Sequence, residues 1–192
     1  MTDGGTFQAE KRAQWRRWLA KNQARENGVW LVTFKKDSGH PHLGYDAAVE
    51  EALCFGWVDS KPGKVDAQRS KLWFAPRKPG TGWSKLNKER AKKLMAAKQM
   101  QTAGREKIKA AKADGSWAKL DAVEALEIPP DLATALMKHP KSAENFSAFP
   151  RFVKRSILEW ISTAKKPETR AARIAETATL AARNERANQW RK

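Results

Sequence analysis

Residues 45–60, YDAAVEEALCFGWVDS, and residues 73–90, WFAPRKPGTGWSKLNKER, carry the most information about how this chain folds. In both stretches tryptophan and phenylalanine stand beside carboxylates and arginines. A solvated surface has no need for so many aromatic residues, and an ordinary core has no need for the charges. The region therefore contains either an internal ion-pair network or a polar site.

The composition indicates a folded protein with a packed core. The chain has 192 residues, enough for one domain or two small ones, and its nine Trp and seven Phe supply large buried areas. A single cysteine, Cys54, cannot form an internal disulfide, which suits a reducing compartment. Because no apolar run reaches the roughly 18 residues that span a bilayer, and the N-terminus lacks an apolar signal core, we expect a cytoplasmic protein.

The net charge of +17 is the second large feature of the sequence. Such a surplus favours phosphate-rich partners or anionic surfaces through counterion release and a long-range field. The alternative is that the basic residues only solubilise helix faces. The sequence leaves both interpretations open.

Hydrophobic periodicity predicts an α+β fold for residues 1–118: a small sheet of three to four strands with flanking helices. Apolar residues on both faces of the strand at 29–36 predict a central strand. Asp46 is the expected N-cap of a helix at 47–55, and Ser84 that of the helix starting at Lys85. The full set of expected elements is helices at 8–27, 47–55, 85–98 and 102–113, and strands at 29–36, 57–60 and 71–75.

Strand-like runs disappear after Trp117, and we expect residues 119–192 to be an all-helical extension packed on the N-terminal core. Residues 121–128 are acidic and predict a linker. Pro129-Pro130 opens the next helix, and further helices follow around residues 143–149 and 153–164. Glu168 starts the last helix, for which the spacing predicts an inward stripe of Ala171, Ile174, Ala175 and Ala178.

Four ordered motifs carry a family resemblance: GVWLVTFKKDSG at 28–39, YDAAVEEALCFGWVDS at 45–60, FAPRKPGTGWSKLNKERAKKL at 74–94 and EWISTAKKPETRAARI at 159–174. Together they resemble the bacterial YdeI/OmpD-associated, bacteriocin-protection-like family. The resemblance implies a cytoplasmic protein without a known cofactor, associated with envelope stress and bacteriocin tolerance. The motif positions it carries over as candidate anion- or ligand-binding residues are Lys35, Glu50, Glu51, Asp59, Arg77, Ser84, Asn87 and Arg90.

Arg90 is predicted to point inward. Trp83, Asn87, Arg90 and Leu94 share one stripe of their helix, opposite its lysines. A buried guanidinium needs a partner, so we expect Arg90 to pair with Glu50, Glu51 or Asp59. The alternative is a pocket for a small anionic ligand around Asp59, Arg77, Asn87 and Arg90, in a binding protein or an enzyme.

No residue pattern predicts catalysis or a metal site. Glu50 and Glu51 diverge by about 100° on a helix, which makes them a poor acid–base pair. Cys54 has acidic and aromatic neighbours and is expected to be an inert buried thiol. His40 and His42 flank a proline in a loop without the spacing of metal ligands. We therefore expect no catalytic residue, no metal and no cofactor.

Residues 61–93 combine basic and aromatic side chains, with eleven Lys and Arg against two acids. Such a mixture can hold single-stranded nucleic acid by charge and base stacking. Alternation along Lys71-Leu72-Trp73-Phe74 leaves Trp73 on the lysine side, while the other aromatic residues can belong to the core. The leading hypothesis is a non-catalytic stress-protection protein whose basic surface binds an anionic partner, for which nucleic acid is a candidate.

Overall fold

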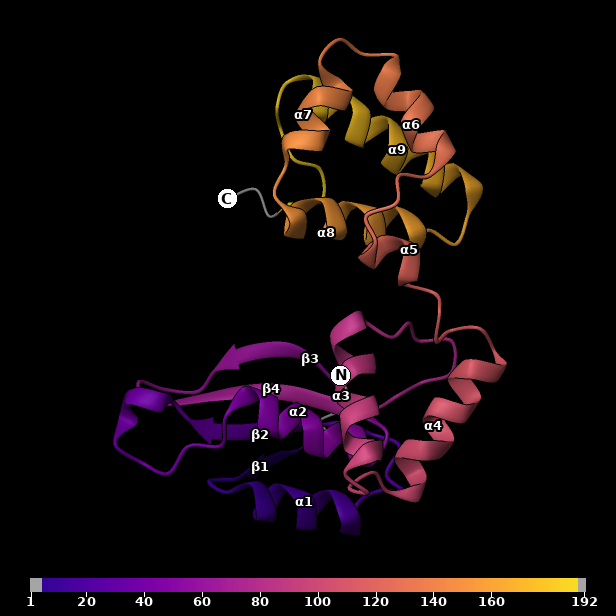
Figure 1. Ribbon diagram of the computed structural model, residues 1–192. Helices are drawn as coiled ribbons and strands as arrows, with labels where there is room; N and C mark the ends of the chain where they lie inside the picture. Colours follow the sequence, from indigo (N-terminus) through magenta and orange to yellow (C-terminus); the bar gives the residue numbers. More distant parts are fainter. Residues whose placement is uncertain (1–4, 190–192) are drawn as a thin grey trace. The chain divides into compact units, whose positions relative to one another are not determined.

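The computed structural model describes residues 5–189 of the chain. They form two compact units that divide between Lys119 and Leu120 (Figure 1). The first unit holds a sheet with flanking helices. In the second unit, up to residue 189, the secondary structure is entirely helical. This confirms the α+β fold with a helical C-terminal part, while the packing of one part on the other stays a prediction.

The first unit contains a mixed sheet that is four-stranded over the described residues (Figure 1). β1 pairs in parallel with β2, and the other neighbours are antiparallel in the order β1-β2-β4-β3. The central position expected for β2 is confirmed, as the apolar residues on both of its faces require. The strands are β1 (Thr6–Gln8), β2 (Val29–Phe34), β3 (Trp57–Lys64) and β4 (Arg69–Pro76).

The strands differ from the sequence prediction in two ways. The prediction missed β1, because a helix was expected from Gln8, whereas α1 (Arg12–Lys21) begins only after a turn. The strands expected at 57–60 and 71–75 are longer, because they form a hairpin that continues past a register shift between Asp59 and Pro62. Both differences come from strand pairing, which short polar segments do not signal locally.

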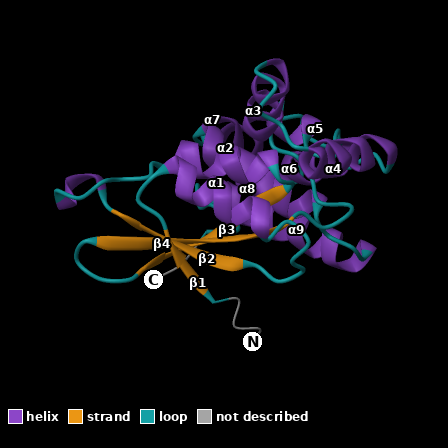
Figure 2. Ribbon diagram, turned by 90° about the horizontal axis from the view of Figure 1, so that it is seen from below, coloured by secondary structure: helices purple, strands orange, loops and turns teal. Residues whose placement is uncertain are grey.

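Helices α1 and α2 (Tyr45–Cys54) cover one face of the sheet (Figure 2). The fully buried Trp15 of α1 stacks on Trp18 with ring centres 5.2 Å apart, and its indole nitrogen donates to the carbonyl oxygen of Ala48 over 3.0 Å. The prediction of Asp46 as N-cap is wrong. Gly44 occupies the N-cap position and Asp46 lies in the first turn, where its carboxylate is free to contact another helix.

Helices α3 (Lys85–Ala96) and α4 (Thr102–Ala113) complete the first unit, after a short 3-10 helix at Lys36–Ser38 earlier in the chain. The hydroxyl oxygen of Ser84 accepts from the backbone nitrogen of Asn87 over 3.3 Å, which confirms the predicted N-cap. Trp83 and Leu94 are buried, as their shared stripe predicted.

The second unit has its own core, centred on Leu132, Phe146 and Ile157. Its first segment is not the predicted linker, because residues 121–124 form a helical turn that buries Val123 in this core. The amphipathic helices that follow agree with the prediction, since their apolar stripes are long enough to be local signals. The helices are α5 (Asp121–Glu124), α6 (Pro130–Met137), α7 (Ser142–Ala148), α8 (Arg151–Ser162) and α9 (Pro167–Ala182).

The inward stripe predicted for the last helix is half wrong. Ile174 and Ala178 are buried, but Ala171 and Ala175 are exposed. These two alanines line a groove of about 510 Å³, and residues of α6 line it too. Of the helices in residues 5–189, each is too short or too polar to cross a membrane.

Candidate functional site

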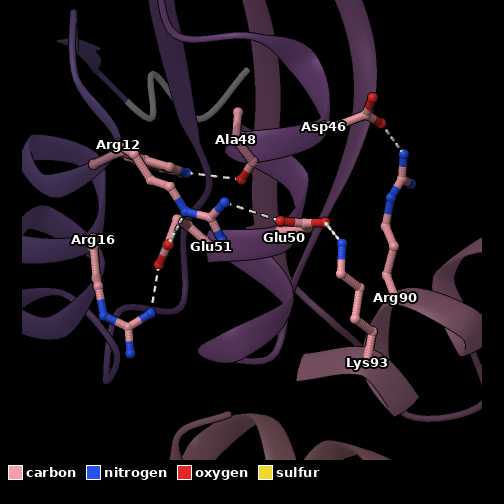
Figure 3. A network of polar contacts seen from close by, with 9 residues as sticks. Arg12, Arg16, Asp46, Ala48, Glu50, Glu51, Arg90 and Lys93 are labelled. Carbon is pink, nitrogen blue, oxygen red and sulfur yellow. Dashed lines mark hydrogen bonds and ion pairs between the residues drawn. The ribbon is translucent and has the colours of Figure 1, made fainter. Parts of the chain in front are cut away.

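An ion-pair network joins α1 to α2 and α3 (Figure 3). The buried carboxylate of Glu51 accepts from Arg12 over 2.5 Å and from Arg16 over 2.6 Å. Glu50 lies 3.0 Å from Arg12 and 3.8 Å from Lys93 of α3. The two glutamates therefore point toward basic side chains of two different helices.

Local sequence explains this network. Arg12 and Arg16 are one helical turn apart and therefore share a face of α1. Glu50 and Glu51 diverge around α2, so Glu51 meets both arginines while Glu50 lies between Arg12 and Lys93 of α3. Burial acts to lower the pKa of both arginines, but the hydrogen bonds and charge of Glu51 outweigh it and raise the pKa of each. Glu51 therefore stabilises the charged form of both guanidinium groups.

Arg90 does not pair with any of the carboxylates predicted for it. Its guanidinium forms an ion pair with Asp46 in the first turn of α2 (Figure 3), and it donates to the side-chain oxygen of Asn87 over 3.1 Å. It also lies 5.7 Å from the centre of the Tyr45 ring. The prediction failed because Asp46 was expected to cap its own helix, which would have occupied its carboxylate.

Asp59 is engaged by a different partner. Its carboxylate accepts a hydrogen bond of 2.9 Å from the hydroxyl of Tyr45. Burial and this hydrogen bond raise the pKa of Tyr45. Lys35 lies at the opposite end of the sheet, where its amine donates to the carbonyl oxygens of Asp66 and Ala67 over 3.2 and 2.7 Å and so holds the turn between β3 and β4.

Arg77 follows β4 and is buried, with 3% of its surface exposed. Its guanidinium lies 4.0 Å from the centre of the Trp83 ring, and one terminal nitrogen donates to the carbonyl oxygen of Gly82 over 3.0 Å. Burial lowers the pKa of Arg77 to about 10, while the negative charge of Asp59 acts in the opposite direction. The pKa stays above neutral, so Arg77 is charged at pH 7.

The structure therefore distributes the candidate residues over several contacts. The cavity that Arg77 lines is formed with Trp83 and residues of the 78–81 loop and α4, and not with Asp59, Asn87 or Arg90. Ser84 and Asn87 meet at the start of α3, and Asn87 links onward to Arg90. Of the four residues around which the sequence suggested a pocket, this cavity includes Arg77 alone, and the pocket around all four stays a prediction.

The face of the sheet opposite α1 and α2 combines aromatic and basic side chains. Trp30 of β2 lies beside its pairing partner Trp73 of β4, edge to face, with ring centres 5.2 Å apart. The amine of Lys71 lies 4.5 Å from the centre of the Trp30 ring. We call this surface, made by Trp30, Phe34, Arg69, Lys71 and Trp73, the outer sheet face. All five residues are half-buried, so each keeps part of its surface accessible.

Sequence reasoning missed several participants in these contacts. Arg12 and Arg16 were not among the predicted site residues, although their one-turn spacing on the tryptophan-bearing helix is the signal that both can meet one partner. Tyr45 and Asp46 were read only as the start of a helix. The apolar residues on both faces of the strand at 29–36 predicted burial on both sides, whereas Trp30 is half-buried and stands beside Trp73 on the outer sheet face.

The histidines of the 36–44 loop contact β2. His40 stacks on Phe34 with ring centres 4.2 Å apart, and the Nδ1 atom of His42 lies 2.6 Å from the carbonyl oxygen of Phe34. Within residues 5–189 His, Cys, Asp and Glu side chains are nowhere grouped in threes that could hold a metal ion.

Each of the two units matches a known protein family. Residues 7–107, more than half of the chain, match the family model described as "Domain of unknown function (DUF8412)". The chain belongs to this family. Residues 125–184 match the model described as "Bacteriocin-protection, YdeI or OmpD-Associated".

The second match confirms the resemblance to the YdeI/OmpD-associated family and places it on the helical part of this DUF8412 protein. The motif at 159–174 lies inside the matched residues, and the three other motifs lie inside the DUF8412 match. Searches of curated proteins and of solved structures returned no match.

Proposed function

We propose that this protein is a non-catalytic, cytoplasmic, bacteriocin- or stress-protection-like protein that binds single-stranded nucleic acid on the outer sheet face. The protective role rests on the description of the family matched by residues 125–184. The binding role rests on one observation: Trp30, Trp73 and Lys71 lie together on the outer sheet face.

The indole rings of Trp30 and Trp73 can stack with nucleobases. A flat indole with an accessible edge or face can receive a nucleobase, and each base–aromatic stack contributes about 1–3 kcal/mol whatever the base. Trp30 and Trp73 are fixed relative to each other by their edge-to-face contact and by direct pairing across β2 and β4. A platform that is already ordered loses little side-chain entropy when a strand binds.

Basic side chains lie beside these rings and can attract phosphates. Lys71 lies against the Trp30 ring, and Arg69 stands at the next outward position of β4. Part of the Arg69 charge is offset by Asp66, whose carboxylate accepts a hydrogen bond of 2.8 Å from the Nε–H group of Arg69. The net charge of +17 adds a positive field that attracts a phosphate backbone.

Fluorescence anisotropy with a labelled ten-nucleotide DNA strand tests the proposal. The wild type should bind, with an affinity that falls steeply as the salt concentration rises. Trp30→Ala should weaken binding about tenfold or more, and Lys71→Gln should make the salt slope shallower by about 0.7. Lys109→Gln, which removes an exposed charge from α4 outside the outer sheet face, is the matched control and should leave both the affinity and the salt slope nearly unchanged.

Two results would count against the proposal. One is no binding at about 0.15 M salt. The other is an equal loss of affinity in Trp30→Ala and in Lys109→Gln, since that would assign binding to general charge and not to the outer sheet face. A duplex of the same sequence should bind more weakly, because its bases are not free to stack on indole rings.

A further inference from the structure

Arg77 is a buried cation whose charge is not matched by a carboxylate. Among residues 5–189 no Asp or Glu lies within ion-pair distance of it, and its Nε–H group has no hydrogen-bond partner. The carbonyl oxygen of Gly82 satisfies one of the terminal nitrogens. A buried guanidinium normally has paired or hydrogen-bonded donors, so this arrangement is incomplete by itself.

Trp83 presents a second incomplete donor at the same place. Its Nε1–H group is buried and, within the described part of the chain, has no acceptor. The Trp83 ring carries the Arg77 guanidinium on its face and packs against Trp117 with ring centres 4.9 Å apart. Both incomplete groups are donors, and one of them is charged. The missing partner must therefore accept hydrogen bonds.

Arg77 and Trp83 both line a cavity of about 50 Å³ between the 77–83 loop and α4. Lys78 and Lys107 line it too, as does one carboxylate, that of Asp114. The Asp114 oxygens already accept from the backbone nitrogens of Gly80 and Ser116, over 3.1 and 2.8 Å. Three cations against one engaged carboxylate leave the cavity positive.

We propose that this cavity binds a small tetrahedral oxyanion, such as a phosphate or sulfate ion, whose oxygens accept from Arg77 Nε–H and Trp83 Nε1–H. Charge-assisted hydrogen bonds from a guanidinium suit such an ion, and its negative charge offsets the unmatched charge of Arg77. The cavity shares no residue with the outer sheet face, and the proposal stands independently of nucleic-acid binding.

Small size makes the site selective. A volume of about 50 Å³ holds a single small ion but not a nucleoside or a strand. Free phosphate and the phosphates of a nucleic acid have the same acceptor chemistry, so the experiment must separate them. It can do so because only the free ion fits inside the cavity.

Thermal melts and calorimetric titration with sodium phosphate, against sodium chloride at equal ionic strength, test the proposal. Phosphate should raise the melting temperature of the wild type more than chloride does. Trp83→Phe keeps the ring under Arg77 but deletes the donor, and should weaken phosphate binding on the order of tenfold or more. Lys107→Gln should also weaken it, whereas Lys109→Gln, an exposed position on the same helix, should leave it unchanged.

Arg77→Gln should abolish the phosphate effect, and Trp83→Phe keeps the test decisive if that variant does not fold. A ten-nucleotide DNA strand at the same phosphate concentration should have the same effect on the wild type and on Trp83→Phe, whether or not DNA binds the outer sheet face. Three outcomes would overturn the proposal. The first is that phosphate and chloride shift the melting temperature equally, and the second is that Trp83→Phe binds phosphate as tightly as the wild type. The third is that DNA stabilises the wild type but not Trp83→Phe, while phosphate stabilises neither protein.

Discussion

Arg90 is held by Asp46, which lies 44 positions earlier in the chain, and this ion pair links α3 to the first turn of α2. The two side chains differ greatly in exposure, with 9% of the Arg90 side chain accessible and 78% of the Asp46 side chain. The carboxylate of this pair is therefore solvated. Removing the arginine leaves an acid in water and not a buried unpaired charge.

Arg90→Ala should lower the free energy of unfolding by about 1–2 kcal/mol, mainly through lost packing of the long side chain and the lost hydrogen bond to Asn87. This is less than the roughly 3–5 kcal/mol expected if Arg90 held a buried carboxylate. Urea denaturation measures the difference. Asp46→Asn is the partner variant: it leaves Arg90 buried, but the new amide oxygen can still accept from the guanidinium, so it should cost no more than Arg90→Ala. A loss of about 3 kcal/mol or more in Arg90→Ala would contradict the pairing with Asp46.

Glu51→Gln should destabilise the protein far more than Glu50→Gln. Glu51 has 4% of its side chain exposed and is shared by two arginines, while Glu50 has 16% exposed and contacts Arg12 and Lys93. Deleting the buried charge should lower the free energy of unfolding by about 3 kcal/mol, and Glu50→Gln by about 1 kcal/mol. Urea midpoints of the two variants, measured side by side, should differ in this order; equal midpoints would show that the α1–α2 network does not depend on Glu51.

Gly104→Ala should destabilise α4 although alanine favours helices. A Cβ atom at Gly104 would lie 2.4 Å from the carbonyl oxygen of Cys54 and 2.7 Å from that of Leu53, and these backbone atoms at the end of α2 cannot move independently. The net loss should be about 1–3 kcal/mol after the roughly 1 kcal/mol gained in helix propensity.

Gly39→Ala separates crowding from backbone strain. Gly39 has a φ of +75° but open space around its Cβ position, so its replacement should cost only about 1 kcal/mol. Chemical denaturation of both variants gives the comparison. A Gly104→Ala protein as stable as the wild type would mean that α2 and α4 do not approach this closely in solution.

Local patterns predicted the elements whose stability is local. The stripes of Val153, Ile157 and Ile161 in α8 and of Trp83 and Leu94 around α3 specify amphipathic helices without reference to the rest of the chain. β1 could not be predicted in this way. Its three residues become a strand only because Phe7 pairs beside Leu31 and packs on the rings of α1.

The polar contacts were harder to predict than the fold. An inward arginine at position 90 follows from periodicity, and so does its need for a partner. Which carboxylate it meets depends on the angle between α2 and α3, and the choice of Asp46 over Glu50 turns on where α2 begins. The Nε–H group of Arg77 and the Nε1–H group of Trp83 lack acceptors because of the path that the 77–83 loop takes. The glycines and prolines of this loop predict a turn but do not specify that path.

Cys54 supplies a pH-dependent prediction. Its side chain is fully buried at the end of α2, and burial raises the pKa of the thiol even though Arg16 acts to lower it. Above the ordinary thiol pKa of about 8.5, the unfolded chain loses a proton that the folded chain keeps. The stability linked to Cys54 is therefore complete below about pH 8 and falls as the pH rises toward the raised folded pKa, by at most about 1.4 kcal/mol per pH unit. Urea midpoints of wild type and Cys54→Ala between about pH 7 and 9.5 isolate this contribution, because the other titrations cancel in the difference; a difference that does not fall with pH would contradict a raised thiol pKa.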